Sequence, residues 1–124
     1  MHYLDPPLRP KVGSKLNVLM ICRVSSPGPG KQREESNDDQ EVRLRRFLGE
    51  VWDGPIDVRV IAGFGSGEKV DRNEYRQAED AVSTDQFDLV LCEDLSRISR
   101  RYHAQVFCEL AEDHDTRVIA VNGG

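Results

Sequence analysis

The chain has 124 residues, of which 38% are hydrophobic and 31% are charged, a composition typical of one globular domain with a charged surface. Its 17 basic and 22 acidic residues give a net charge of −5, which argues against strong nucleic-acid binding by the domain as a whole. No apolar run reaches the roughly 18 residues that a membrane span needs, and the first residues lack the apolar segment of a signal peptide. We therefore expect a cytoplasmic protein without a membrane partner.

The cysteines agree with this expectation. Cys22 and Cys92 lie in apolar runs, Cys108 lies on an apolar helix face, and no two of them are close in sequence. Cysteines of this kind are typical of reduced core side chains in a cytosolic protein.

The first half of the chain begins with a segment that lacks periodicity. Residues 1–15 hold three prolines, which predicts a flexible leader. Residues 16–23 form a continuous apolar run, typical of a strand covered on both faces. The proline- and glycine-rich stretch 25–35 predicts a loop, and Ser36 is a cap for a helix that stops before the glycine-proline pair at 54–55.

The second half continues the alternation of strands and helices. The same signals predict a strand over 56–62 and a mobile glycine-rich loop over 63–67. A helix then extends from its cap Asp71 to about residue 84, with Glu74 three residues after the cap. It is followed by a strand over 87–92, a helix after residue 100 and a strand over 117–121. Such alternation implies a parallel sheet with helices on both faces. The predicted fold class is therefore α/β, an open three-layer sandwich with a mostly parallel four- to five-stranded sheet and flavodoxin-like topology.

Arginine and serine side chains follow two of the predicted strands. Arg23 ends the first strand and is followed by Ser25, and a serine- and arginine-rich stretch, 96–100, follows the third. A charge at the end of a core strand needs a partner, and open α/β sheets bind ligands at the carboxyl ends of their strands. Together with Arg72, the arginines of both clusters would surround a phosphodiester with planar donors, and Ser25 would be a suitable nucleophile. The alternative is that these arginines pair with surface acids.

Four motifs stand in register with the predicted elements. They are Arg23-Val24-Ser25 at the end of the first strand, Ser36-Asn37-Asp38-Asp39-Gln40 at the start of the first helix, Ser66-Gly67 with Asp71-Arg72 around the start of the second helix, and Leu95-Ser96-Arg97-Ile98-Ser99-Arg100 after the third strand. With these motifs the chain resembles the catalytic domain of the serine recombinases, the resolvase/invertase family and its large relatives. The resemblance extends from about residue 16 to residue 124 and implies a resolvase-like topology.

The resemblance implies a specific reaction. Ser25 would be the nucleophile that joins a DNA 5′-phosphate and frees a 3′-hydroxyl. The residues that would hold the scissile phosphate are Arg23, Arg72, Arg97 and Arg100, with Gln40 supporting the site. The expected DNA contacts are Ser66, Ser96 and Arg101. Neither a cofactor nor a metal is implied, and the expected partners are DNA and further copies of the full-length protein, which would work as a dimer that pairs into a tetramer.

Two positions depart from the family pattern. Ser96 stands where members often carry an aspartate, and Gly63 stands where many carry an acid, so the groups that transfer protons stay open. By domain, the resemblance implies a leader over 1–15 and a catalytic domain over 16–124, with the following helix and the DNA-binding domain outside this sequence. We therefore expect this piece alone to bind DNA weakly and to recombine nothing.

Several alternatives accompany this interpretation. Ser26 could attack in place of Ser25, and the glycines of 63–67 could form a nucleotide-binding loop, although that loop lacks the lysine of a P-loop. His103 and His114 are too far apart on one helix to share a metal. The basic group Arg43, Arg45 and Arg46 is typical of a solvated helix face, with DNA contact as the alternative. The protein could also be a non-catalytic α/β module that keeps the fold for assembly or regulation, but the complete serine–arginine set favours an enzyme.

Overall fold

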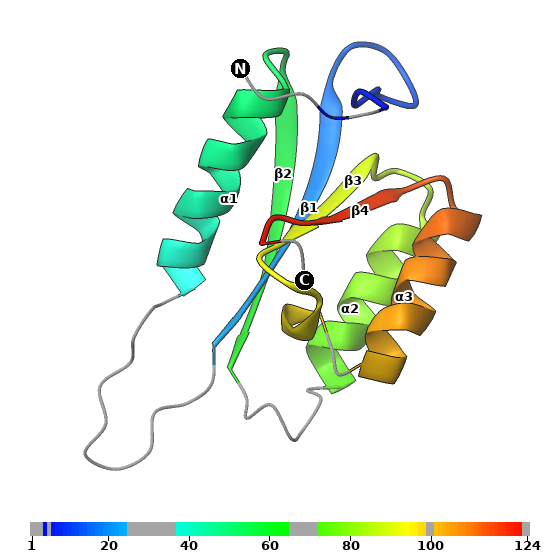
Figure 1. Ribbon diagram of the computed structural model, residues 1–124. Helices are drawn as coiled ribbons and strands as arrows, with labels where there is room; N and C mark the ends of the chain where they lie inside the picture. The colour runs from blue at the N-terminus through cyan, green and yellow to red at the C-terminus, as the bar shows by residue number, and fades with distance from the viewer. Residues whose placement is uncertain (1–3, 5, 25–36, 65–71, 99–100, 123–124) are drawn as a thin grey trace.

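The structure, a computed structural model, describes residues 4, 6–24, 37–64, 72–98 and 101–122. Its elements in chain order are β1 (Leu16–Val24), α1 (Asn37–Val51), β2 (Ile56–Phe64), α2 (Arg72–Ser83), β3 (Leu89–Cys92), the short 3₁₀ helix η1 (Leu95–Arg97), α3 (Arg101–Asp113) and β4 (Arg117–Ala120). Strands and helices alternate as the sequence predicts (Figure 1).

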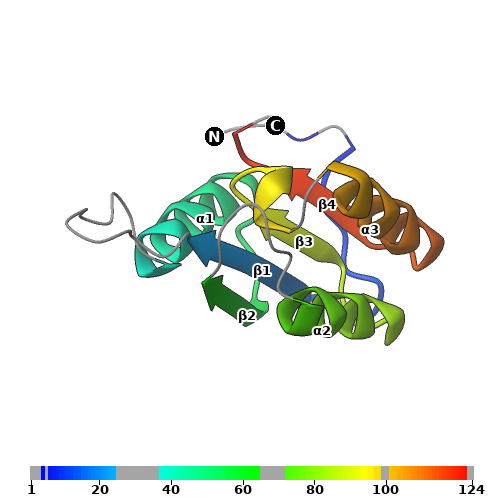
Figure 2. The same cartoon turned by 90° about the horizontal axis from the view of Figure 1, so that it is seen from below.

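The four strands form one parallel sheet in the order β2-β1-β3-β4. Helix α1 covers one face, and α2 and α3 lie together on the other (Figure 2). The chain moves from β1 outward to β2 and then crosses back over β1 to β3, and right-handed connections in opposite directions place their helices on opposite faces. The predicted three-layer α/β sandwich with flavodoxin-like topology is confirmed.

Side chains of β1 alternate between two cores. Leu19 and Ile21 pack with α2 and α3, whereas Val18 and Met20 pack with α1. All four are buried, because the strand is covered on both faces. This double coverage explains why the run appears continuously apolar in the sequence.

On each helix, one stripe of side chains faces the core. On α1 this stripe holds Gln40, Leu44 and Leu48, which are four residues apart and fully or almost fully buried. Val42, which the periodicity placed with the apolar residues, is 57% exposed, because a residue two positions from Leu44 points to the opposite side of the helix. Val106 on α3 is likewise exposed.

The second strand is longer than predicted. Gly63 and Phe64, which the sequence assigned to a mobile loop, belong to β2. They pair with Arg23 and Val24, so that β1 and β2 stay in register along the full length of both strands. The rest of the predicted loop, 65–67, lies outside the described residues.

The segment before β1 lies against the domain in its described part. Leu8 is 7% exposed and packs in the α1-side core. The Lys11 backbone N–H donates to Asp88 at 2.7 Å, and its ammonium donates to the Asp85 carbonyl at 3.2 Å. The flexibility of this leader stays a prediction. Among the described residues, no helix is long and apolar enough to cross a membrane.

Candidate active site at the carboxyl edge of the sheet

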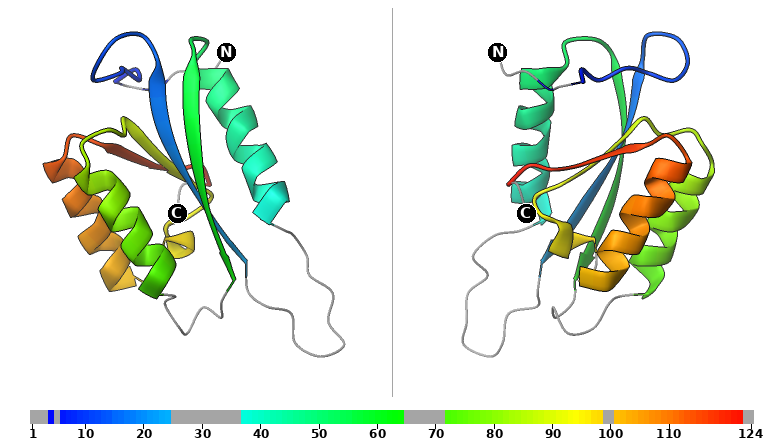
Figure 3. Two further views of the ribbon diagram at one scale, coloured as in Figure 1. Left: turned by 180° about the vertical axis from the view of Figure 1, so that it is seen from behind. Right: turned by 45° about the vertical axis from the view of Figure 1, so that its right-hand side comes forward.

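The topology creates one preferred binding position. The connections that leave β1 and β3 run in opposite directions along the sheet, so their carboxyl ends flank a topological switch point, where open α/β sheets bind ligands. Arg23 lies at this end of β1, and η1 follows β3 there (Figure 3). Arg23 and the turn that carries Arg97 therefore lie at the position where this fold binds ligands.

Gln40 holds the end of β1. The pairing of β1 with β3 ends at Met20 and Leu91. Further along β1, the Arg23 N–H donates to Gln40 Oε1 at 3.2 Å, and Gln40 Nε2 donates to the Arg23 carbonyl at 2.9 Å. Gln40 is fully buried, so its amide satisfies backbone groups that a neighbouring strand would otherwise satisfy.

Arg97 reaches the same carbonyl from the other side of the switch point. Its Nη1 donates to the Arg23 carbonyl at 2.8 Å. α1 and η1 thus both fix the backbone two residues before Ser25 in the chain. Ser25 itself lies outside the described residues.

Asp94 organises the turn that carries Arg97. Its side chain caps η1 and accepts a hydrogen bond from the Ser96 N–H at 3.0 Å and another from the Ser96 hydroxyl. Its second carboxylate oxygen lies 3.7 Å from Arg97 Nε. A carboxylate therefore stands beside Arg97, although Ser96 occupies the position where the resemblance leads one to expect an aspartate.

A small hollow lies at this edge of the sheet, and part of its lining is charged. Its charged lining residues are Arg23, Glu74 and Arg97, and Gly63 closes it from β2. Its volume is about 10 Å³, which is close to the space that one water molecule needs. Arg23 is 9% exposed, and Glu74 and Arg97 are half-buried, so the charged residues that line the hollow are partly dehydrated.

An ion pair ties α1 to the end of β3. Arg43 Nη2 donates to Glu93 Oε1 at 2.9 Å, and Arg43 Nε donates to the other oxygen of this nearly buried carboxylate. Arg45 pairs with Glu41 on the exposed face of the same helix at 2.7 Å. Arg43 therefore differs from a purely solvated basic residue: its side chain is 41% exposed, but it pairs with Glu93, which lies opposite it in the fold.

The thiols at this edge stay protonated. Burial, together with the carboxylates of Glu41 and Glu93, raises the pKa of the Cys22 thiol to about 11. Burial raises the pKa of Cys92 to about 12. Because the thiolate is the reactive form of cysteine, neither side chain competes with a serine as nucleophile near neutral pH. All three cysteines are free thiols.

The other predicted site residues are described in part or not at all. Ser66 and Arg100 lie outside the described residues, as does Ser26. Arg72 and Arg101 are described by their backbone, as the first residues of α2 and α3. Both helices begin near the carboxyl edge of the sheet (Figure 3). No group of three or more histidine, cysteine or acidic side chains within the described ranges could hold a metal ion.

Sequence reasoning missed three acidic residues of this site. Glu93 and Asp94 carried no signal beyond following an apolar strand, and Glu74 stood out only by its spacing from Asp71. Their partners are distant in sequence: 50 residues separate Glu93 from Arg43. Local patterns do not predict such pairs.

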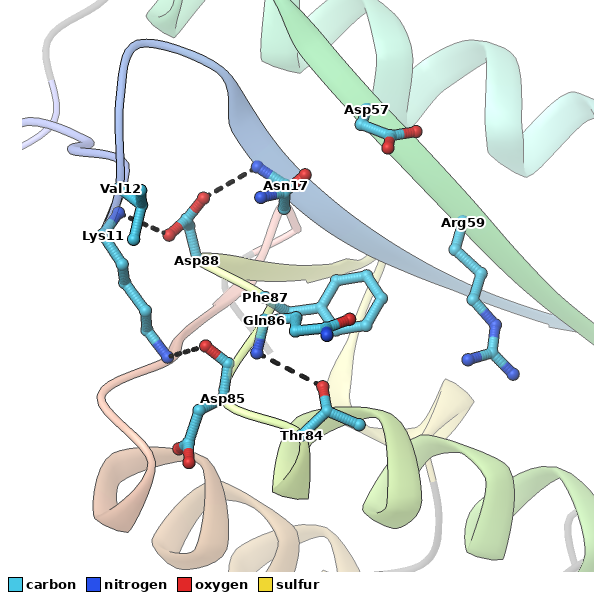
Figure 4. A pocket seen from close by; sticks show the side chains of 10 residues that line it. All are labelled: Lys11, Val12, Asn17, Asp57, Arg59, Thr84, Asp85, Gln86, Phe87 and Asp88. Carbon is cyan, nitrogen blue, oxygen red and sulfur yellow. Dashed lines mark hydrogen bonds between the residues drawn. The ribbon is translucent and has the colours of Figure 1, made fainter.

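A wider hollow lies among the described residues at the opposite edge of the sheet. It has a volume of about 550 Å³, and its polar lining includes Asn17, Asp57, Arg59 and Asp88 (Figure 4). There the Asp88 carboxylate accepts from the Asn17 N–H at 2.7 Å and also binds the Lys11 backbone. These contacts attach the leader to the start of the sheet and lie far from the switch point.

Comparisons with known proteins place the chain in a family. A family model described as the resolvase N-terminal domain matches residues 18–124. The chain therefore belongs to the resolvase N-terminal domain family and is a catalytic domain of the serine site-specific recombinase class. None of the curated proteins matches the chain closely enough to count as a relative.

Solved structures agree on the fold. The C-terminal catalytic domain of ISC1926 TnpA, an IS607-like serine recombinase, is 21% identical with a TM-score of 0.71, and the match covers 87% of this chain and 72% of that one. The N-terminal catalytic domain of TP901-1 integrase is 23% identical with a TM-score of 0.68 and coverages of 86% and 78%. The first ORF of transposon ISC1904 from Sulfolobus solfataricus P2 is 17% identical with a TM-score of 0.65 and coverages of 88% and 69%.

Proposed function

We propose that residues 16–124 form a catalytic domain that cleaves and rejoins DNA through a covalent link between Ser25 and a 5′-phosphate. The observation that carries this proposal is the double hold on the end of β1. Gln40 and Arg97 both bind the backbone of Arg23, and Ser25 follows two residues later. A nucleophile needs a backbone that is held in place in this way, because small displacements of reacting groups reduce rates strongly.

The reaction balances without an outside reactant. The Ser25 hydroxyl oxygen attacks phosphorus, the new oxygen–phosphorus bond forms, and the bond to the 3′-oxygen breaks. The serine loses its proton and the departing 3′-oxygen gains one. Rejoining reverses these steps when a 3′-hydroxyl attacks the phosphoserine.

The arginines stabilise the charge that develops at phosphorus. Arg23 and Arg97 already lie together at the carboxyl edge, and we assign Arg72 and Arg100 to the same phosphate. Planar guanidinium groups match phosphate oxygens in geometry and stay charged. Removal of one such preorganised donor costs about a hundred- to a thousand-fold in rate. Gln40 supports the site, while Ser66, Ser96 and Arg101 contact the DNA.

Family membership implies DNA as substrate and self-association during the reaction. Dimers that pair into a tetramer would bring two duplexes together for exchange. The acidic net charge of −5 fits a division of labour in which parts of the full-length protein outside this domain supply sequence-specific affinity.

A covalent trap tests the nucleophile. Full-length protein is incubated with its recombination site carrying a nick near the cleavage position, so that the cut end diffuses away and the adduct persists. We expect a protein–DNA adduct with the wild-type protein and with Ser26→Ala, and none with Ser25→Ala. An adduct that persists in Ser25→Ala but disappears in Ser26→Ala would move the nucleophile by one residue. Absence of any adduct with the wild-type protein would support a non-catalytic module.

A further inference from the structure

Glu74 takes no part in the reaction as described so far, yet its carboxylate lies at the candidate site. It stands in the first turn of α2, and one of its carboxylate oxygens, Oε2, is buried. Glu74 lines the small hollow together with Arg23 and Arg97. A carboxylate in such a place needs a reason, because burial of a charge is costly unless other groups compensate for it.

Gly63 makes the room for this carboxylate. A Cβ added to Gly63 would lie 2.8 Å from Glu74 Oε1 and 2.9 Å from Glu74 Cδ, so the carboxylate would have to move from its present position. The φ angle of Gly63 is outside the left-handed region, so backbone conformation does not require glycine here. The requirement is close approach between the end of β2 and the carboxylate.

The charges in the hollow explain why a carboxylate belongs there. Arg23 and Arg97 both line this hollow of about 10 Å³, and like charges repel strongly where water is scarce. Apolar side chains, among them Ile21, Ile61 and Ile98, form much of the remaining wall. A carboxylate in the same lining offsets the repulsion between the two arginines and favours one orientation of their guanidinium groups.

Arg97 is oriented from two further sides. Asp94 lies 3.7 Å from its Nε, and the Arg23 carbonyl accepts from its Nη1 at 2.8 Å. Glu74 faces the hollow from α2, an element that neither of these contacts involves. The Arg97 guanidinium is therefore held by Asp94 of its own turn and by the end of β1 before any phosphate arrives.

We propose that Glu74 is a positioning residue of the active site, whose carboxylate over Gly63 holds the guanidinium groups of Arg23 and Arg97 in the arrangement that receives the scissile phosphate. The proposal rests on the proposed function. It assigns to Glu74 preorganisation of the arginines rather than contact with the reacting atoms. The carboxylate comes from α2, whereas the arginines come from β1 and η1.

The experiment measures the rate of the Ser25–DNA adduct at several concentrations of the nicked site, with full-length protein. Glu74→Gln keeps the shape and removes the charge, and Asp80→Asn on the exposed side of α2 is the matched control. We expect Glu74→Gln to lower the rate at saturating DNA by about ten- to a hundredfold. We also expect it to change the DNA concentration for half-maximal rate by less than about threefold, because the positioned step follows binding. Asp80→Asn should behave as wild type.

Variants at Gly63 provide a second, independent test. Gly63→Ala places a Cβ against the carboxylate and should lower the rate in the wild-type background. In the Glu74→Ala background the same change should add less than about a twofold loss, because contacting residues are non-additive. Gly63→Asp combined with Glu74→Ala returns a carboxylate to the hollow from β2 and should recover part of the rate. Recovery of this kind separates positioning from a general loss of folding.

The outcomes distinguish the two proposals. A normal adduct rate in Glu74→Gln, with the adduct abolished in Ser25→Ala, overturns the role of Glu74 and leaves the proposed function intact. If Glu74→Gln unfolds, the combined Gly63→Asp and Glu74→Ala variant decides, and a folded variant without recovery overturns the role. Absence of an adduct with the wild-type protein overturns the proposed function, and the role of Glu74 with it.

Discussion

Gln40 is the residue on which the geometry of the candidate site depends most directly. Its amide donates to one backbone group of Arg23 and accepts from the other. A fully buried glutamine is uncommon unless both ends of its amide have partners. Here the partners are backbone atoms of a strand end, so the side chain substitutes for a neighbouring strand.

We predict that Gln40→Ala lowers the free energy of unfolding of the domain by about 1–3 kcal/mol, because it leaves buried backbone groups of Arg23 without this partner. Urea unfolding of the variant and the parent measures the difference. Gln86→Ala, at an exposed position, is the control and should stay within about 0.5 kcal/mol of the parent. Equal stabilities of Gln40→Ala and the parent would show that the amide adds nothing to the fold.

At the scale of elements, α1 connects two strand ends. Its first turn binds the end of β1 through Gln40, and one turn later Arg43 binds Glu93 after β3. The helix also carries Leu44 and Leu48 into the core. The position of α1 is thus coupled to both sides of the switch point.

We predict unequal effects from two neighbouring arginines of α1. Arg43→Ala removes charged hydrogen bonds to a nearly buried carboxylate and should cost about 1–3 kcal/mol of unfolding free energy. Arg45→Ala removes an exposed pair with Glu41, four residues away in the helix, and should cost less than about 0.5 kcal/mol. Thermal and urea unfolding of both variants provide the comparison. Similar losses for the two would mean that the Glu93 pair behaves as a surface pair.

The elements themselves were largely predictable, whereas their ends were less so. The apolar run of β1 and the stripe of α1 follow from periodicity that local geometry imposes. The extension of β2 through Gly63 and Phe64 follows instead from pairing with β1, and glycines in a sequence normally indicate a loop. Val42 shows the same limit, because an apolar residue type does not by itself tell which side of a helix it occupies.

At the scale of the whole molecule, the net charge indicates that this domain contributes little to DNA affinity. The net charge of −5 opposes binding to a polyanion over most of the surface, and Arg23 and Arg97 at the carboxyl edge are already engaged with protein groups. A protein with few phosphate contacts binds DNA weakly and with a shallow dependence on salt.

We predict that the 124-residue domain alone binds duplex DNA weakly, without sequence preference, and catalyses no recombination. A band shift at moderate salt, with the recombination site and a scrambled duplex of equal length as the pair, measures this. The full-length protein is the positive control. Tight binding by the isolated domain that is specific for the site would contradict the prediction.

The order of elements, the parallel sheet and the position of the serine–arginine motifs at strand ends are properties of the sequence by itself, because apolar periodicity and turn residues act over a few neighbouring positions. Tertiary structure alone decided that Gln40 binds Arg23, that Glu93 faces Arg43 and that Glu74 lies over Gly63. These partners come from different elements, and their contacts affect stability because buried polar groups need partners. Only the folded chain brings them to one edge of the sheet.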